Sequence, residues 1–136
     1  MQNKIVIENL ISNARKQLKI LEQWSGWSKK EIEKDDATRG AIERYLYLAV
    51  QATINLAEAI IAYKKLRKPS TLSEAFYILA ENSIISKELA LKLEKMVGLR
   101  NVLAHDYVGV DYGVVVDVLN ARHRDIEEFL DIARTL

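Results

Sequence analysis

The chain has no cysteine, only two histidines, one proline and five glycines among its 136 residues. Without cysteine it can form neither a disulfide nor a thiolate metal site, and two histidines far apart in the sequence do not predict a zinc site. Few prolines and glycines leave little room for the tight turns of a β-sheet. No apolar run approaches the ~20 residues of a membrane span, and the N-terminal residues do not resemble a signal peptide. We therefore expect a cytoplasmic protein that needs no membrane, metal or cofactor.

Charge of one sign is also lacking, since 20 lysines and arginines face 19 acidic residues and the net charge is +1. A protein that coats nucleic acid typically has a large positive net charge, which this chain lacks. Any nucleic-acid contact must therefore come from a local basic patch. A basic cluster near the middle of the chain, Lys64, Lys65, Arg67 and Lys68, is one candidate. The same cluster is also explained by the preference of cations for the C-terminal end of a helix.

The residues that are present favour helix. Apolar residues make up 49% of the chain, charged residues make up 29%, and leucine, alanine, isoleucine, glutamate and lysine are frequent. Apolar side chains recur at helical spacing in several segments, and capping residues precede them. We predict an all-α fold, an antiparallel bundle of about five helices in a single domain of residues 1–136. Four of the expected helices span residues 3–24, 36–65, 87–103 and 111–134. A shorter expected helix, between the second and the third of these, begins at a Thr71–Glu74 capping box and ends at about Glu81.

The second of these helices is unusually long and apolar. At 1.5 Å per residue it would measure about 40 Å, whereas the radius of gyration of a domain of this size is only ~14 Å. Its main stripe is apolar, and further apolar residues lie off that stripe, among them Leu48, Ile54 and Leu56. A helix that is apolar on more than one face needs a second partner, and a homodimer would supply one. Three polar residues on the opposite side, Gln51, Asn55 and Glu58, are explained equally by solvent, a dimer contact or a site.

Chemistry-bearing residues concentrate in the stretch from Arg100 to Tyr107, which reads RNVLAHDY. An arginine binds phosphate as a planar fork and keeps its charge, whereas a histidine exchanges protons near neutral pH. Arg100 and His105 together can bind a phosphodiester and move protons on it. The alternative is that both residues only cap the last carbonyls of a helix.

The stripe of the fourth predicted helix bears on this choice. After Leu89, Leu93, Met96 and Val97, the next position on the stripe is Arg100, so its side chain should face the bundle, where a guanidinium must be paired or lie in a cleft. His105 lies about 140° away on a regular helix. The two can share a site only if the helix ends or distorts between them, or if two chains of a dimer each contribute. Gly109 favours a helix end near His105.

The whole stretch resembles the R-x-x-x-x-H-x-Y signature of the HEPN superfamily, in its HepT-like branch. The resemblance covers nearly the whole chain, because four further segments match that branch in order: LRKP at 66–69, EAF at 74–76, IIS at 84–86 and GLRN at 98–101. It implies a five-helix HEPN domain that acts as a homodimer. It also implies the toxin half of a HEPN/MNT toxin–antitoxin pair, with ribonuclease activity on RNA.

The family's residue roles transfer to matching positions of this sequence. Its catalytic arginine and histidine correspond to Arg100 and His105, and its motif tyrosine corresponds to Tyr107. In that family a minimal nucleotidyltransferase (MNT) antitoxin can silence the toxin by attaching AMP to this tyrosine. Asn101 and Asp106 are supporting candidates without a defined role, since Asp106 can orient the imidazole or simply face water.

From these residues we expect metal-independent RNA cleavage that leaves a 2′,3′-cyclic phosphate. The competing hypothesis is a non-catalytic helical domain that docks to a nucleotidyltransferase or binds a nucleotide. A docking domain has no need to bring His105 into one cleft with Arg100, so the arrangement of these two residues discriminates between the hypotheses.

Overall fold

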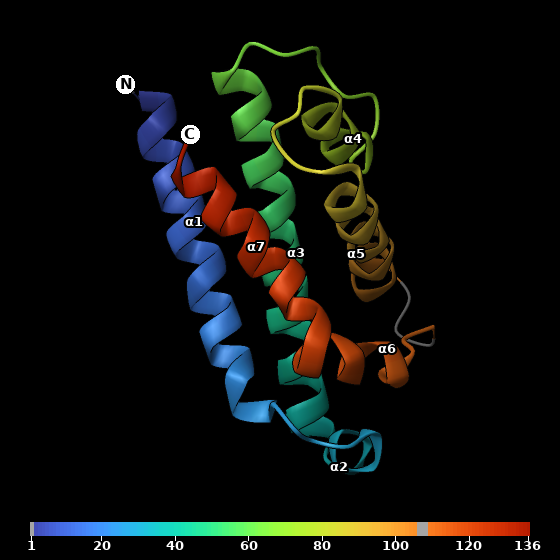
Figure 1. Ribbon diagram of the computed structural model, residues 1–136. Helices are drawn as coiled ribbons and strands as arrows, with labels where there is room; N and C mark the ends of the chain where they lie inside the picture. The colour runs from blue at the N-terminus through green and yellow to red at the C-terminus, as the bar shows by residue number, and fades with distance from the viewer. Residues whose placement is uncertain (1, 106–108) are drawn as a thin grey trace.

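The computed structural model describes residues 2–105 and 109–136, and within them it contains helices and no strand, which confirms the all-α prediction. The helices that form the bundle run antiparallel to one another in chain order (Figure 1). They are α1 (Gln2–Leu21), α3 (Asp36–Tyr63), α5 (Lys87–His105) and α7 (His123–Arg134). Shorter elements connect them: the 3-10 turn η1 (Glu22–Trp24), α2 (Lys29–Lys34), α4 (Glu74–Glu81), α6 (Tyr112–Asp117) and the π-helical turn η2 (Val118–Arg122).

Side-chain caps set several of these helix starts. Ser28 and Glu31 form a complete capping box at α2, each side chain accepting a hydrogen bond from the other's backbone N–H. The hydroxyl of Ser86 accepts the N–H of Leu89 at 3.0 Å and so opens α5. Asp111 caps α6 by accepting the N–H of that helix's second residue. These bonds satisfy N–H groups that have no partner within the helix.

Helix ends differ from the prediction in small ways. The α-helical part of the first helix ends at Leu21, and the chain continues as a 3-10 turn before Gly26, whose φ of +84° suits a residue without a Cβ. The predicted helix over residues 111–134 is divided, because a π-helical turn at Val118–Arg122 separates α6 from α7. Sequence periodicity cannot show such a local change of hydrogen-bond register.

Helix α3 is the centre of the bundle. It packs against α1 on one side and against α4 and α5 on the other (Figure 1). Ile54 and Leu56, which lie off the main stripe, are both 0% exposed within the single chain. For Ile54 and Leu56 the inference of a dimer partner was therefore wrong, because α3 is covered from two sides by its own chain, whereas Leu48, the third off-stripe residue, is only half-buried. The homodimer itself stays a prediction.

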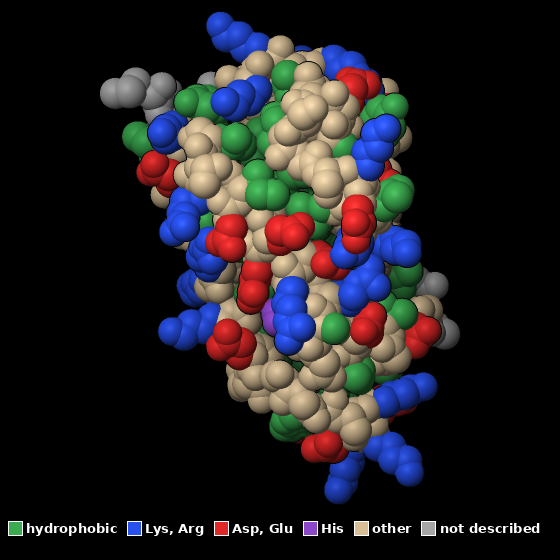
Figure 2. All heavy atoms as spheres, viewed as in Figure 1, with side chains coloured by type: hydrophobic (Ala, Val, Ile, Leu, Met, Phe, Trp, Pro, Cys, Tyr) green, Lys and Arg blue, Asp and Glu red, His purple; other side chains and the backbone are tan. Residues whose placement is uncertain are grey.

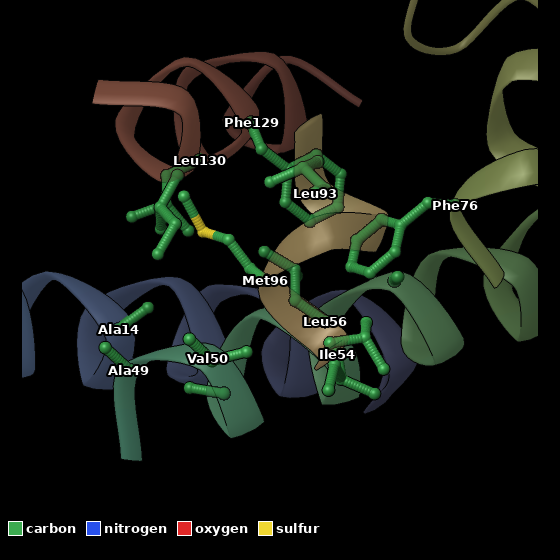
Figure 3. Close-up of a cluster of buried hydrophobic side chains, with 14 of the residues drawn as sticks. Ala14, Ala49, Val50, Ile54, Leu56, Phe76, Leu93, Met96, Phe129 and Leu130 are labelled. Atoms are coloured by element: carbon green, nitrogen blue, oxygen red, sulfur yellow. The ribbon is translucent and has the colours of Figure 1, made fainter. Parts of the chain in front are cut away.

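The core draws on every helix of the bundle. Figure 3 shows side chains of α1, α3, α4, α5 and α7 converging on one interior. Phe76 of α4 and Phe129 meet edge to face, with ring centroids 5.8 Å apart and an interplanar angle of 77°. This arrangement is the one that aromatic quadrupoles favour. The core therefore anchors α4 and α7, and with them the two helices, α3 and α5, that carry the candidate site.

By length and composition, α3 is apolar enough to cross a membrane, but 56% of its most apolar window is buried inside the protein. A buried core helix passes the same test, so this is weak evidence for a membrane span. On the face shown in Figure 2, acidic and basic side chains are interspersed without a block of one sign. A local site, and not the charge of this face, must account for any binding of a polyanion.

Candidate functional site

Arg100 projects from α5 toward α3, as the stripe predicted. Its side chain is half-buried, and its Nε donates a hydrogen bond to Oε1 of Gln51 at 2.7 Å. Its Nη1 donates to Oδ1 of Asn101 at 3.0 Å. The guanidinium carbon also lies 5.4 Å from the centroid of the Tyr47 ring, within the range of a cation–π interaction. Three contacts thus orient this side chain.

None of these partners carries a negative charge. Within the described residues, Arg100 forms no ion pair, whereas four other arginines do: Arg15, Arg39, Arg67 and Arg122. Neutral amide and aromatic partners hold the guanidinium in place without neutralising it. As far as the described residues go, its charge therefore remains available to an anion such as a phosphate.

The guanidinium opens onto a groove between α3 and α5 with a volume of about 560 Å³. His105, the last residue of α5, lines the same groove and is exposed to solvent. The remaining lining residues are Gly40, Glu43, Arg44 and Tyr47 of α3 and Leu103 and Ala104 of α5. The structure therefore brings Arg100 and His105 to one cavity within a single chain.

The route by which they meet differs from the expectation. Helix α5 is regular from Arg100 to His105, so no distortion separates the two residues, and no second chain is needed to bring them to one cavity. They share the groove because it follows the last turn of α5, as the lining by Leu103 and Ala104 shows. The requirement for a break in the helix, or for a contribution from a second chain, was therefore too strict.

Only one acidic residue, Glu43, lines this groove in the described part of the chain. Its Oε2 accepts a hydrogen bond from the hydroxyl of Tyr112, the first residue of α6. Burial, together with this bond to the Glu43 carboxylate, raises the pKa of Tyr112 above its ordinary value. Glu43 makes no ion pair with either Arg44 or Arg100 in the described structure.

Three residues of α3 contact this site: Arg44 and Tyr47, which were missed as candidates, and Gln51, for which a site was one of three open explanations. They follow one another at spacings of three and four, so they share one face of the helix. That polar and aromatic run was the available signal, but it did not show which helix would lie opposite. Nε2 of Gln51 donates to Oδ1 of Asn55 at 2.8 Å, which turns the amide so that its oxygen faces Arg100.

Known proteins resemble this chain along nearly its whole length. A family model described as "Ribonuclease HepT-like" matches residues 14–133. The mRNA nuclease HepT of Shewanella oneidensis is 30% identical over 132 residues, covering 97% of this chain and 98% of the relative. The chain belongs to the HepT-like ribonuclease family. The resemblance found in the sequence is thus confirmed.

Other members of the family differ in the RNA that their names mention. The tRNA nuclease HepT of Aphanizomenon flos-aquae is 39% identical over 69 residues, which cover 51% of this chain and 47% of that relative. Among solved structures, a tri-AMPylated Shewanella oneidensis HEPN toxin in complex with an MNT antitoxin superposes with a TM-score of 0.88 at 29% identity, covering 96% of this chain and 98% of that one. The bundle is thus the HEPN toxin fold.

Within this HepT-like chain the motif residues are only partly described. Arg100 and His105 line the groove, and Asn101 is exposed and accepts a hydrogen bond from Arg100. Asp106 and Tyr107 lie outside the described residues, so their expected roles stay predictions. Asn101 thereby gains a structural task that the sequence did not suggest, since it holds one arm of the guanidinium.

Proposed function

We propose that this protein, with residues 1–136 as one HEPN-like domain, is an RNA endonuclease and the toxin of a HEPN/MNT toxin–antitoxin pair. The observation that carries the proposal is the groove in which Arg100, a cation without an acidic partner in the described structure, lies together with His105. Membership of the HepT-like family and the nuclease names of its relatives support it. A domain used only for docking would not need these two residues in one cavity.

The proposed reaction is a transphosphorylation that requires no metal. The 2′-oxygen of the ribose forms a bond to the adjacent phosphorus while the bond from phosphorus to the 5′-oxygen breaks. His105 accepts the proton of the 2′-hydroxyl, a solvent water protonates the leaving 5′-oxygen, and the imidazolium returns its proton to the resulting hydroxide. The products are a 2′,3′-cyclic phosphate and a 5′-hydroxyl.

Arg100 has the electrostatic part in this proposal. Negative charge builds up on the non-bridging phosphate oxygens as the fifth bond to phosphorus forms, and an oriented guanidinium stabilises it. Gln51, Asn101 and Tyr47 hold the guanidinium before substrate arrives, so little reorganisation is needed during the reaction. Arg100 is accordingly a catalytic residue of the proposal, and the other three are positioning residues.

The test is cleavage of purified RNA by the wild-type protein in the presence of EDTA, followed by identification of the product ends. We expect cleavage with cyclic phosphate ends, and we expect its loss in Arg100→Ala and in His105→Ala. His123→Gln is the matched control, because His123 is the chain's second histidine and lies in α7 with its Nδ1 3.1 Å from the carbonyl of Val118. Undiminished cleavage by His105→Ala, or a strict need for a divalent ion, would contradict the mechanism. If the wild-type protein cleaved no RNA, the docking hypothesis would be favoured.

The proposed regulation is attachment of AMP to Tyr107 by the MNT antitoxin. A bulky anionic group attached two residues after His105 in the chain would compete for Arg100 and repel RNA phosphate. Incubation with the cognate nucleotidyltransferase and ATP should release pyrophosphate and raise the protein's mass by at least one adenylyl group (AMP less water) in the wild type and in Tyr112→Phe, but not in Tyr107→Phe. Modification that persisted in Tyr107→Phe would place the acceptor elsewhere.

We also propose that the protein acts as a homodimer whose two-fold axis passes near the C-terminal end of α5. Such an axis would bring two Arg100–His105 grooves into one larger cleft able to hold a folded RNA. Sedimentation equilibrium tests the oligomeric state, and a monomer at the concentrations at which cleavage occurs would refute this part alone.

A further inference from the structure

A second arginine lies in the groove, and the proposed reaction has not used it. Arg44 of α3 is exposed, and its guanidinium carbon lies 5.6 Å from the centroid of the Tyr47 ring. The guanidinium of Arg100 lies 5.4 Å from the same centroid. Tyr47 is thus the shared neighbour of two cations.

Neither cation is neutralised within the described residues. Arg44 forms no ion pair there, although Glu43, its neighbour in the sequence, lines the same groove. Glu43 instead accepts the hydroxyl of Tyr112. Two like charges beside one ring repel one another, and a bound anion would relieve that repulsion. The groove therefore has the electrostatic character of a site for more than one negative charge.

We infer that Arg44 and Tyr47 form a second phosphodiester subsite, in which Arg44 binds the RNA phosphate next to the one held by Arg100. Tyr47 sets the spacing of the two guanidinium groups by cation–π contact with both. The subsite rests on the proposed ribonuclease function. It extends that function, because a second subsite predicts that the enzyme binds at least two successive phosphates of the RNA. The occupant is a single RNA strand, since the two cations converge on one ring and not along an extended face.

Binding to short RNA strands tests the subsite without the complication of cleavage. His105→Ala provides the background, and fluorescence anisotropy measures affinity for a dinucleotide with one phosphodiester and for a tetranucleotide with three. Adding Arg44→Ala should weaken tetranucleotide binding by about fivefold at moderate salt and lower the slope of log K against log salt by about one phosphate contact. Dinucleotide binding should change little, because Arg100 alone can hold its one phosphate.

Matched variants separate the subsite from general charge and from folding. Arg124→Ala is the charge control, since Arg124 of α7 is exposed and has no ion pair in the described structure. It should leave both affinities unchanged. Tyr47→Leu removes the ring that both guanidinium groups contact and should weaken tetranucleotide binding. Thermal melts of all variants show whether the fold is kept.

The outcomes distinguish the subsite from the function on which it rests. If the His105→Ala background binds the tetranucleotide and Arg44→Ala does not weaken it, or if Arg124→Ala weakens it equally, the subsite is overturned while the ribonuclease proposal stands. If neither the background nor the wild type binds or cleaves RNA, both proposals fail together. An equal loss for dinucleotide and tetranucleotide would make Arg44 part of the Arg100 site and would also overturn a separate subsite.

Discussion

Replacing Gln51 by leucine should slow RNA cleavage without unfolding the protein. The substitution keeps the approximate volume of the side chain and removes the oxygen that accepts Nε of Arg100 at 2.7 Å. A hydrogen bond to a charged group contributes about 1.5–3 kcal/mol. Because Arg100 is only half-buried, water replaces part of that interaction, and we expect a net loss of about 1–2 kcal/mol of transition-state stabilisation. At ~1.4 kcal/mol per factor of ten, this predicts a rate roughly 5- to 30-fold lower.

Single-turnover cleavage at saturating protein measures this effect, since it isolates the chemical step from RNA binding. Gln51→Glu keeps an acceptor oxygen at the same distance from the backbone but pairs the guanidinium with a negative charge, so it should also cleave more slowly than the wild type, even though Arg100 is held in place. Asn55→Ala removes only the bond that turns the Gln51 amide, at 2.8 Å, and should have a smaller effect than Gln51→Leu. A wild-type rate in Gln51→Leu would refute the view that Gln51 positions Arg100, and a wild-type rate in Gln51→Glu would refute the view that the guanidinium must stay without a negatively charged partner.

The remaining predictions concern stability. Gly98→Ala in α5 should stabilise the protein by up to ~1 kcal/mol in thermal unfolding, because an added Cβ meets nothing within 4 Å. Gly26→Ala should destabilise the protein in the same measurement, since the φ of Gly26 is +84°. Phe129→Ala should lower the free energy of unfolding by about 3–5 kcal/mol in urea titrations, because its ring is 0% exposed. The raised pKa of Tyr112 means that the folded state binds this proton more tightly than the unfolded state does. This contribution to the free energy of unfolding is complete below the ordinary pKa of 10.0 and is lost as the pH rises above it. Tyr112→Phe lacks the titrating group bonded to Glu43, so its free energy of unfolding should fall less steeply with rising alkaline pH than that of the wild type. Equal slopes of the free energy of unfolding against pH would argue against this assignment.

Much of the fold was predictable because the signals are local. Capping bonds join residues that lie two or three apart in the sequence, as at Ser28, Ser86 and Asp111, so they form wherever a helix begins. The inward direction of Arg100 followed from the same kind of reasoning, because helical periodicity fixes which face a residue shares with its apolar neighbours.

The predictions that went wrong depended on which helices meet. The off-stripe residues of α3, such as Ile54, predicted a second chain, but α4 and α5 of the same chain supply the cover. The requirement for a helix break or a second chain to bring Arg100 and His105 together was too strict for a related reason. A groove between two helices can continue around the end of one helix, so residues on more than one of its faces can line it.

The sequence by itself determined the helices, their caps, the inward position of Arg100 and, through its motif, the family. Only the tertiary structure decided what surrounds that arginine. Gln51 lies 49 residues away in the chain, and nothing in local periodicity pairs it with Arg100. Tyr47 and Arg44 likewise reach the groove only because α3 and α5 pack against one another. Helical periodicity shows only which residues share a face of one helix. Whether the guanidinium groups in the groove have an acidic partner among the described residues depends on contacts between helices.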